Sequence, residues 1–238
     1  QGASGASYMC FVLVMLAGSL MGFFLLLDPR QVVKEDGALV SMPPSKKIME
    51  EVSDVIHAMN TRSLLLLSPL FLCSNWFYTY VFNCVNAVLF NVRTRGFNSA
   101  MYWFAQMLAA VWAGRMLDNN SSQSSLHRRG MTGFWRMLLL FNLSYALGVY
   151  LQVAYEGGYE RGESGTRRLI DISEPSRFAF PLLVLVLYAA ADTLVQVYSY
   201  WIMSAVAGED ASACARFTGF YKGVQSLGAA MAWAMDME

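Results

Sequence analysis

Six stretches of the chain are apolar enough and long enough to cross a lipid bilayer. A spanning helix needs about 20 mostly apolar residues to cross the hydrocarbon core. The stretches that approach this length, with ends set to within a few residues, are Tyr8–Leu27, Leu64–Phe90, Ser99–Leu117, Met137–Tyr155, Phe178–Val206 and Phe217–Met235. The pattern therefore predicts an all-α, polytopic integral membrane helix bundle with about six transmembrane helices.

The first two stretches are joined by a polar segment, Asp28–Arg62, that contains a helical pattern of its own. Pro43-Pro44-Ser45 indicates a helix start, with Ser45 as its N-cap. Apolar residues then recur at helical spacing opposite a charged face; they are Ile48, Val52, Val55, Ile56 and Met59. This pattern is typical of an amphipathic helix at a membrane surface, and a helix that binds a partner protein is the alternative.

These elements divide the chain into three parts. We expect a first transmembrane helix over residues 1–27 and a polar loop with the surface helix over residues 28–63. Residues 64–238 are expected to form a bundle of five transmembrane helices. Basic residues indicate the orientation, because ten of them fall on the side that contains Asp28–Arg62 and six on the other. The Asp28–Arg62 loop is therefore predicted to face the cytoplasm in a multi-pass protein.

Composition agrees with a membrane protein and excludes several other classes. Charged residues make up 14% of the chain, against about 25% in soluble domains, and mean hydropathy is +0.38. The 17 basic residues balance 17 acidic ones, so a nucleic-acid partner is not expected. The two histidines, His57 and His127, lie in polar segments without metal-ligand spacing, and nucleotide or nucleophile motifs are absent. We expect no enzyme activity, cofactor or metal site.

Charged residues inside the apolar stretches are the strongest functional signal. Asp192 lies deep within Phe178–Val206, and Gln196 follows one helical turn later. A carboxylate at that depth is costly, so it should face a cavity, find a partner or stay protonated. Lys222 lies within the last stretch, and an ion pair with Asp192 is one hypothesis. In the alternative, Lys222 extends to the membrane surface while hydroxyls and amides hold Asp192.

Neutral polar residues follow one face of the second stretch. They recur at i, i+4, i+8 and i+11 at Asn75, Thr79, Asn83 and Asn86. Such groups need partners in a bilayer, so this face either lines a solute pathway or hydrogen-bonds other helices. The full set of candidate cavity or substrate residues is Asn75, Tyr78, Thr79, Asn83, Asn86, Gln106, Asp192, Gln196, Lys222 and Gln225.

The last stretch is rich in small residues. Gly219, Gly223 and Gly228, followed by Ala229 and Ala230, would allow another helix to approach closely. This composition indicates helix packing more than a substrate path.

Several motifs resemble a known family. The sequence Gly114, Arg115 and Asp118, followed by Arg128 and Arg129, resembles the cytoplasmic G-x-x-x-D…R latch motif of major facilitator transporters. Longer strings are similar to the Unc-93-like (uncoordinated-93-like) branch of that superfamily; they are residues 74–98, 191–203 and 216–226.

The resemblance implies a partial major-facilitator-type fold. The first stretch would correspond to the sixth of twelve family helices and the last stretch to the eleventh, with Asp28–Arg62 as the central cytoplasmic linker. The family works by rocking two six-helix halves around a midplane site. The expected partners are therefore the lipid bilayer and either other membrane proteins or the missing transporter half.

Two functions remain open on this basis. The first is a transporter-like integral membrane protein that moves an ion or small solute through a polar midplane cavity. The alternative is a non-transporting regulatory or scaffold subunit of a larger membrane assembly, as the resemblance also implies.

Overall fold

The computed structural model describes residues 5–26, 31–33, 37, 47–118, 125–160, 168–208 and 210–236. The chain divides into two units, residues 1–48 and 49–238. In the first unit, α1 (Gly5–Leu25) forms a single straight apolar helix, as predicted. The predicted N-cap Ser45 lies outside the described residues, but the surface helix that it would begin is present as α2 (Ile48–Met59). The boundaries predicted for the three parts of the chain remain a prediction.

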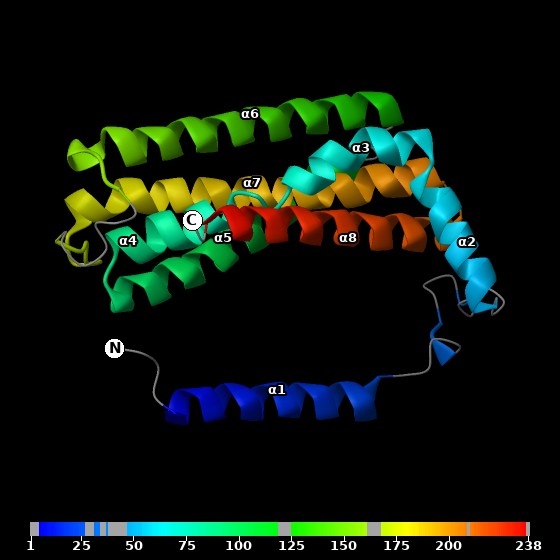
Figure 1. Ribbon diagram of the computed structural model, residues 1–238, viewed down its shortest axis with the longest axis horizontal. Helices are drawn as coiled ribbons and strands as arrows, with labels where there is room; N and C mark the ends of the chain where they lie inside the picture. The colour runs from blue at the N-terminus through cyan, green and yellow to red at the C-terminus, as the bar shows by residue number, and fades with distance from the viewer. Residues whose placement is uncertain are drawn as a thin grey trace. The chain divides into compact units, whose positions relative to one another are not determined.

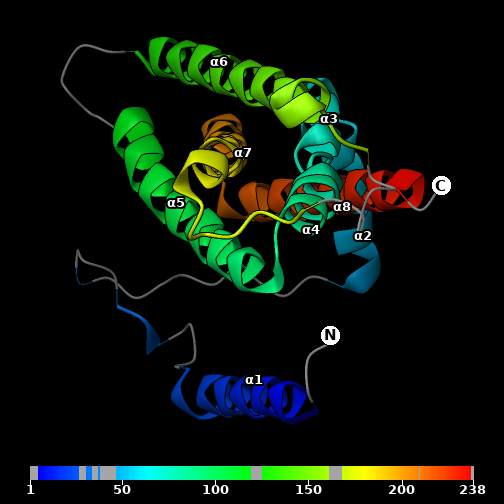
Figure 2. The same ribbon diagram turned by 90° about the vertical axis from the view of Figure 1, so that its left-hand side faces the viewer.

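The second unit is a bundle of helices (Figure 1). After α2 its elements are α3 (Arg62–Cys73), the π-helix η2 (Tyr80–Asn86), α4 (Ala87–Leu89), α5 (Val92–Asp118), α6 (Leu126–Val153), the short helix η3 (Tyr155–Gly157), α7 (Pro175–Ala207) and α8 (Ala211–Asp236). Helix α7 packs against α5, α6 and α8, while α8 also packs against α3. Seen along the bundle, α7 has α5 and α6 on either side (Figure 2).

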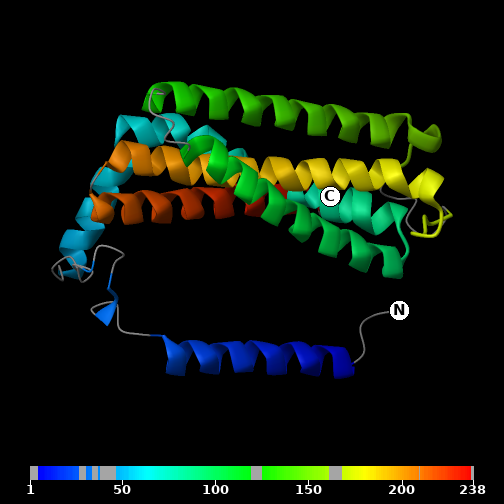
Figure 3. The ribbon, with the colours of Figure 1, turned by 180° about the vertical axis from the view of Figure 1, so that it is seen from behind.

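Burial explains why α7 occupies this position. Many of its apolar side chains, among them Val184, Leu185 and Leu194, are nearly or completely buried. By contrast, α5 and α6 each keep an exposed apolar side. Figure 3 shows α5 running obliquely across α7, and the contact between these two helices is extensive.

The all-α membrane bundle is confirmed. Among the described helices, α1, α6 and α7 are long and apolar enough to cross a bilayer. The pair α2 and α3 would be a fourth span if it counts as one, although the two helices are bent by 79°. Helices α5 and α8 are also long, with 27 and 26 residues, but no stretch of either is apolar and uncharged enough to count as a membrane span by composition alone. Six spans therefore remain a prediction.

The stretch Leu64–Phe90 is broken, which corrects the prediction of one long helix. Helix α3 ends at Cys73, and residues 74–77 form turns before the π-helix begins. The Ser74 hydroxyl donates to the Phe71 carbonyl oxygen at 2.7 Å, so it takes over an acceptor of the helix. Pro69, inside α3, removes a further backbone donor. Ser74 and Pro69 thus interrupt the backbone hydrogen bonds of the helix, and the apolar length of the stretch gave no sign of this.

Helices α3 and α8 approach each other closely at Gly228. A Cβ atom built on Gly228 would lie only 1.9 Å from the carbonyl oxygen of Leu72. Gly219 and Gly223, on the same helix, have open space at this position. Of the three glycines, Gly228 is therefore the one where the absence of a side chain permits the helix contact.

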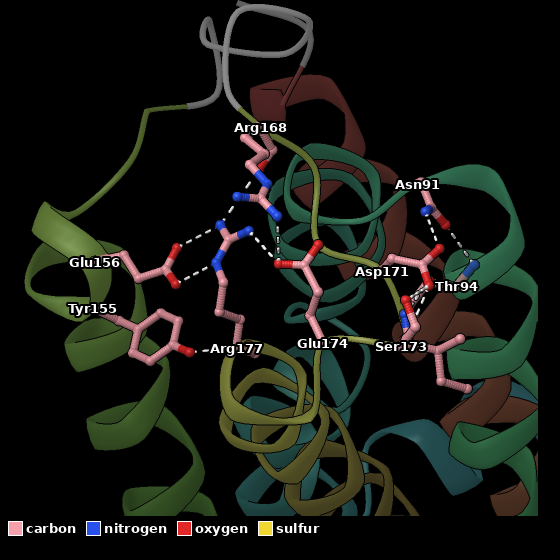
Figure 4. A network of polar contacts seen from close by, with 10 residues as sticks. Asn91, Thr94, Tyr155, Glu156, Arg168, Asp171, Ser173, Glu174 and Arg177 are labelled. Carbon is pink, nitrogen blue, oxygen red and sulfur yellow. Dashed lines mark hydrogen bonds and ion pairs between the residues drawn. The ribbon is translucent and has the colours of Figure 1, made fainter.

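One end of the bundle is held together by two polar clusters (Figure 4). In the first, Arg177 donates two hydrogen bonds to Glu156, at 2.6 and 2.7 Å, and one to Glu174 at 3.1 Å. The Tyr155 hydroxyl also donates to the Arg177 carbonyl oxygen at 2.9 Å. This cluster joins the end of α6 to the beginning of α7. A two-pronged pair of this kind fixes orientation as well as distance.

The second cluster joins the beginning of α5 to the loop before α7. Asp171 accepts hydrogen bonds from Asn91 at 2.5 Å, from Arg93 at 2.8 Å and from Ser173. Beside it, Phe90 and Ile170 form an isolated parallel β-bridge. Hydrogen bonds from Asn91 and Ser173, helped by the charge of Arg93, lower the pKa of Asp171 below its usual range.

We predict that Gly228→Ala destabilises the protein by about 3 kcal/mol, because the added methyl group must push the α3 backbone away. Thermal unfolding of the purified protein in detergent measures the loss. Gly223→Ala is the matched control, and should unfold at the wild-type temperature or slightly above it. A Gly228→Ala variant as stable as wild type would contradict the close contact.

We also predict that the stability supplied by Asp171 depends on pH in the acidic range. Because the folded pKa is lowered, this contribution is complete above the unfolded value of about 4 and is lost as the pH falls below it. Thermal unfolding of wild type and Asp171→Asn should differ at neutral pH, and the difference should shrink progressively as the pH falls below about 4 toward the lowered folded pKa. A difference that stays constant on acidification would show that the charge of Asp171 is not responsible.

Candidate functional site

Asp192 lies in the middle of α7 and is completely buried. Its Oδ2 atom accepts hydrogen bonds from the Tyr78 hydroxyl at 2.7 Å and the Tyr102 hydroxyl at 3.3 Å, and also from the Gln106 amide. Its Oδ1 atom accepts from the Gln196 amide at 2.8 Å. Donors from three parts of the bundle therefore converge on one carboxylate, as a buried polar group requires.

Gln196 connects this carboxylate to Lys222. The Gln196 nitrogen donates to Asp192, while its Oε1 atom accepts from the Lys222 ammonium at 3.2 Å. Lys222 also donates to Gln225 at 2.8 Å, and its Nζ atom lies 4.9 Å from the centre of the Tyr221 ring. An amide thus separates the two charges, which corrects the hypothesis of a direct Asp192–Lys222 pair. The ammonium is also held inside the bundle by these contacts.

The polar contacts continue from Lys222 to the break in the second stretch. The Gln225 nitrogen donates to Ser74 Oγ at 3.0 Å, to Asn75 Oδ1 at 3.1 Å and to the Tyr221 hydroxyl at 2.9 Å. We call the series from Asp192 through Gln196, Lys222 and Gln225 to Asn75 the polar chain. It joins the unwound residues 74–77 to α8 and α7, and to α5 through Gln106.

The structure does not bring all predicted site residues into the polar chain. Thr79 is buried and bonds the backbone oxygen of Trp76 at 3.4 Å. Asn83 donates to Asp236 at 2.5 Å, and Asn86 accepts from Asn98 at 3.0 Å. The predicted stripe is dispersed because the break and the π-helix change the helical register after Asn75. Tyr102 and Ser74, which were not in the predicted set, do contact the polar chain.

One residue of the predicted latch motif, Arg129, links α5 to α6, and the role of the motif as a latch stays a prediction. Arg129 on α6 donates to the carbonyl oxygen of Leu117, at the end of α5, at 3.2 Å. Arg115, Asp118 and Arg128 are exposed, and Gly114 is half-buried. The observed link between the helices is therefore an arginine that satisfies a free helix-end carbonyl group.

An arginine that sequence reasoning passed over fixes the surface helix. Arg216, near the start of α8, donates to both carboxylate oxygens of Glu51 at 2.9 and 3.1 Å, and to Asp54 at 3.1 Å. Most of the predicted apolar stripe of α2 is exposed, with Val52 46% and Ile56 54% exposed, while Val55 is half-buried. This arrangement fits a helix whose acidic face binds the bundle while its apolar face meets lipid.

An open pocket lies beside the polar chain, between α5 and α7. Its volume is about 520 Å³, and its lining includes Gln106 and Gln196, which both bond Asp192 on their other side. A second pocket shares Val197 and Tyr200 with the first and continues toward Gly114 and Asp118. Two residues that line the cavity therefore also hydrogen-bond the buried carboxylate of Asp192.

Comparison with known proteins agrees with the resemblance. The chain is 35% identical over 231 residues to UNC93-like protein 1 and UNC93-like protein 2 of Arabidopsis thaliana, covering 97% of this chain and 49% of each relative. It is 30% identical over 239 residues to an UNC93-like protein of Schizosaccharomyces pombe, covering 97% of this chain and 44% of the relative. No family model matches the chain, and no solved structure is significantly similar.

The chain thus spans about half the length of the curated relatives that it matches. The expected resemblance is confirmed: over nearly its whole length, this membrane protein chain is homologous to UNC93-like proteins, as a segment equal to about half of each one.

Proposed function

We propose that the chain is part of a transporter-like membrane protein that moves a small solute or ion past the polar chain. The observation that carries this proposal is the buried carboxylate of Asp192, held by Tyr78, Tyr102, Gln106 and Gln196. Ionisable groups inside membrane helices are expensive, and they commonly mark pathways for ions or substrates. Neutral amides alone could join the helices at lower cost.

The broken helix supports the same proposal. The polar chain ends at Ser74 and Asn75, where α3 has stopped and the backbone forms turns. Transporters commonly place their sites at discontinuous helices near the membrane midplane, because unwound backbone groups can serve as ligands there. The π-helix that follows is a further irregularity of the kind often found at functional sites.

The second candidate is a non-transporting regulatory or scaffold subunit. It is favoured by the hydrogen bonds that already occupy Asp192 and Lys222, since such contacts also serve to join helices. In either case the partner in the membrane would be the other half of a transporter or another membrane protein. On the proposed topology, α2 lies on the cytoplasmic side.

We predict that transport depends on Asp192. The full-length protein, reconstituted in proteoliposomes, should take up at least one member of a panel of labelled inorganic cations and small neutral solutes. Asp192→Asn should reduce that flux by about tenfold or more. Asn142→Ala is the matched control, because Asn142 is an exposed amide on α6 whose nitrogen donates to Leu138 on its own helix.

Two outcomes would contradict the transport proposal. The first is flux that Asp192→Asn leaves at the wild-type rate, which would remove any role for the carboxylate. The second is a stable, correctly reconstituted protein that moves none of the panel, which would favour the subunit function instead.

A further inference from the structure

The pocket between α5 and α7 has a lining that is uncharged and largely aromatic or apolar. Its polar groups are the amides of Gln106 and Gln196, which enter from different helices, and the hydroxyls of Thr193 and Tyr200. Its apolar lining includes the aromatic side chains of Trp103 and Tyr200, together with Met107, Ala110 and Val197. Its volume of about 520 Å³ lies in the usual range for small-molecule sites.

The charged groups next to this pocket, Asp192 and Lys222, are already hydrogen-bonded within the protein. Asp192 is completely buried, and both of its oxygens accept hydrogen bonds from the chain. Lys222 donates to the amide oxygens of Gln196 and Gln225. An ion that binds against this lining would give up part of its water without meeting a free opposite charge, and that loss is not compensated. The lining therefore selects against ions.

The polar groups that remain available fit a neutral amide. Gln106 lines the pocket and uses its nitrogen on Asp192, so its carbonyl oxygen is the atom of this amide that could accept a hydrogen bond from a solute. Trp103 supplies an indole N–H, and this group makes no hydrogen bond within the part of the chain that the structure describes. The residues that line this one cavity thus include an amide acceptor, an indole donor and two aromatic side chains.

We propose that this pocket binds an uncharged, planar aromatic solute that carries an amide-type donor and acceptor. The proposal rests on the proposed transport function, and names the class of solute that the site would receive. The aromatic ring of the solute lies against Trp103 and Tyr200, and its N–H group donates to Gln106 Oε1. A neutral solute can enter without breaking the contacts between Asp192 and Lys222.

Three probes of similar size, each a benzene ring with one small substituent, test the charge selectivity. They are benzamide, which is neutral, benzoate, which is an anion, and benzylamine, which is a cation at neutral pH. Binding to the purified full-length protein in lipid nanodiscs is measured by calorimetry. Benzamide should bind saturably, with a dissociation constant at least about tenfold lower than that of either charged probe. Equal or tighter binding of benzylamine or benzoate overturns the proposal.

Variants of two neighbouring aromatic residues test the location. Trp103→Ala removes a pocket wall without touching a hydrogen bond of Asp192, and should weaken benzamide binding by about tenfold. Phe104→Ala is the matched control, because Phe104 is similarly exposed on α5 but does not line the pocket. The intrinsic fluorescence of Trp103 gives a second readout: benzamide should change it, and Trp103→Phe should abolish the change. Wild-type affinity in Trp103→Ala overturns the proposal.

The binding and flux results separate this proposal from the one on which it rests. Ion flux that depends on Asp192, without benzamide binding, would overturn the neutral-solute site and leave transport standing. Saturable benzamide binding that depends on Trp103, without any flux, would support the site and contradict transport.

Discussion

The structure depends on the accommodation of one carboxylate inside an apolar helix. Asp192 occupies the middle of α7, where water is excluded, so the protein itself must supply its hydrogen-bond donors. Tyr78, Tyr102, Gln106 and Gln196 do so from three parts of the bundle. The requirement places polar side chains at corresponding depths on elements that are otherwise apolar, and it brings these elements together around α7.

The same requirement connects the carboxylate to a cation and to a break in the chain. Gln196 can bridge Asp192 and Lys222 because an amide offers both a donor and an acceptor. Gln225 then extends the contacts to Ser74 and Asn75, where α3 has ended. Gly228 lets α8 approach α3 closely, near this contact. The close packing at Gly228 and the hydrogen bonds of Gln225 therefore lie on the same helix, α8. The pocket between α5 and α7 lies beside Asp192 and Lys222, which already have hydrogen-bond partners.

The membrane bundle, the amphipathic helix α2 and the burial of Asp192 could be predicted from the sequence, because hydrophobic length, helical spacing and isolated charge are local signals. The break after Cys73 was not predicted, since the Ser74 hydroxyl and Pro69 act on individual backbone bonds that leave apolar length unchanged. The stripe from Asn75 to Asn86 failed as a single face for the same reason. The partners of Arg216 and Arg177 were also missed, because Glu51 lies 165 residues from Arg216 and such pairings depend on the tertiary fold.

A double-mutant cycle on Asp192→Asn and Lys222→Met measures the coupling between the buried carboxylate and the half-buried ammonium most directly. Each single variant leaves the hydrogen bonds of the other charge incomplete and should cost about 1–3 kcal/mol of unfolding free energy. The double variant removes both charges, so its loss should be smaller than the sum of the single losses by at least about 1 kcal/mol. Losses that simply add would contradict the bridge through Gln196. They would also show that Asp192 and Lys222 do not compensate each other's charge within the protein.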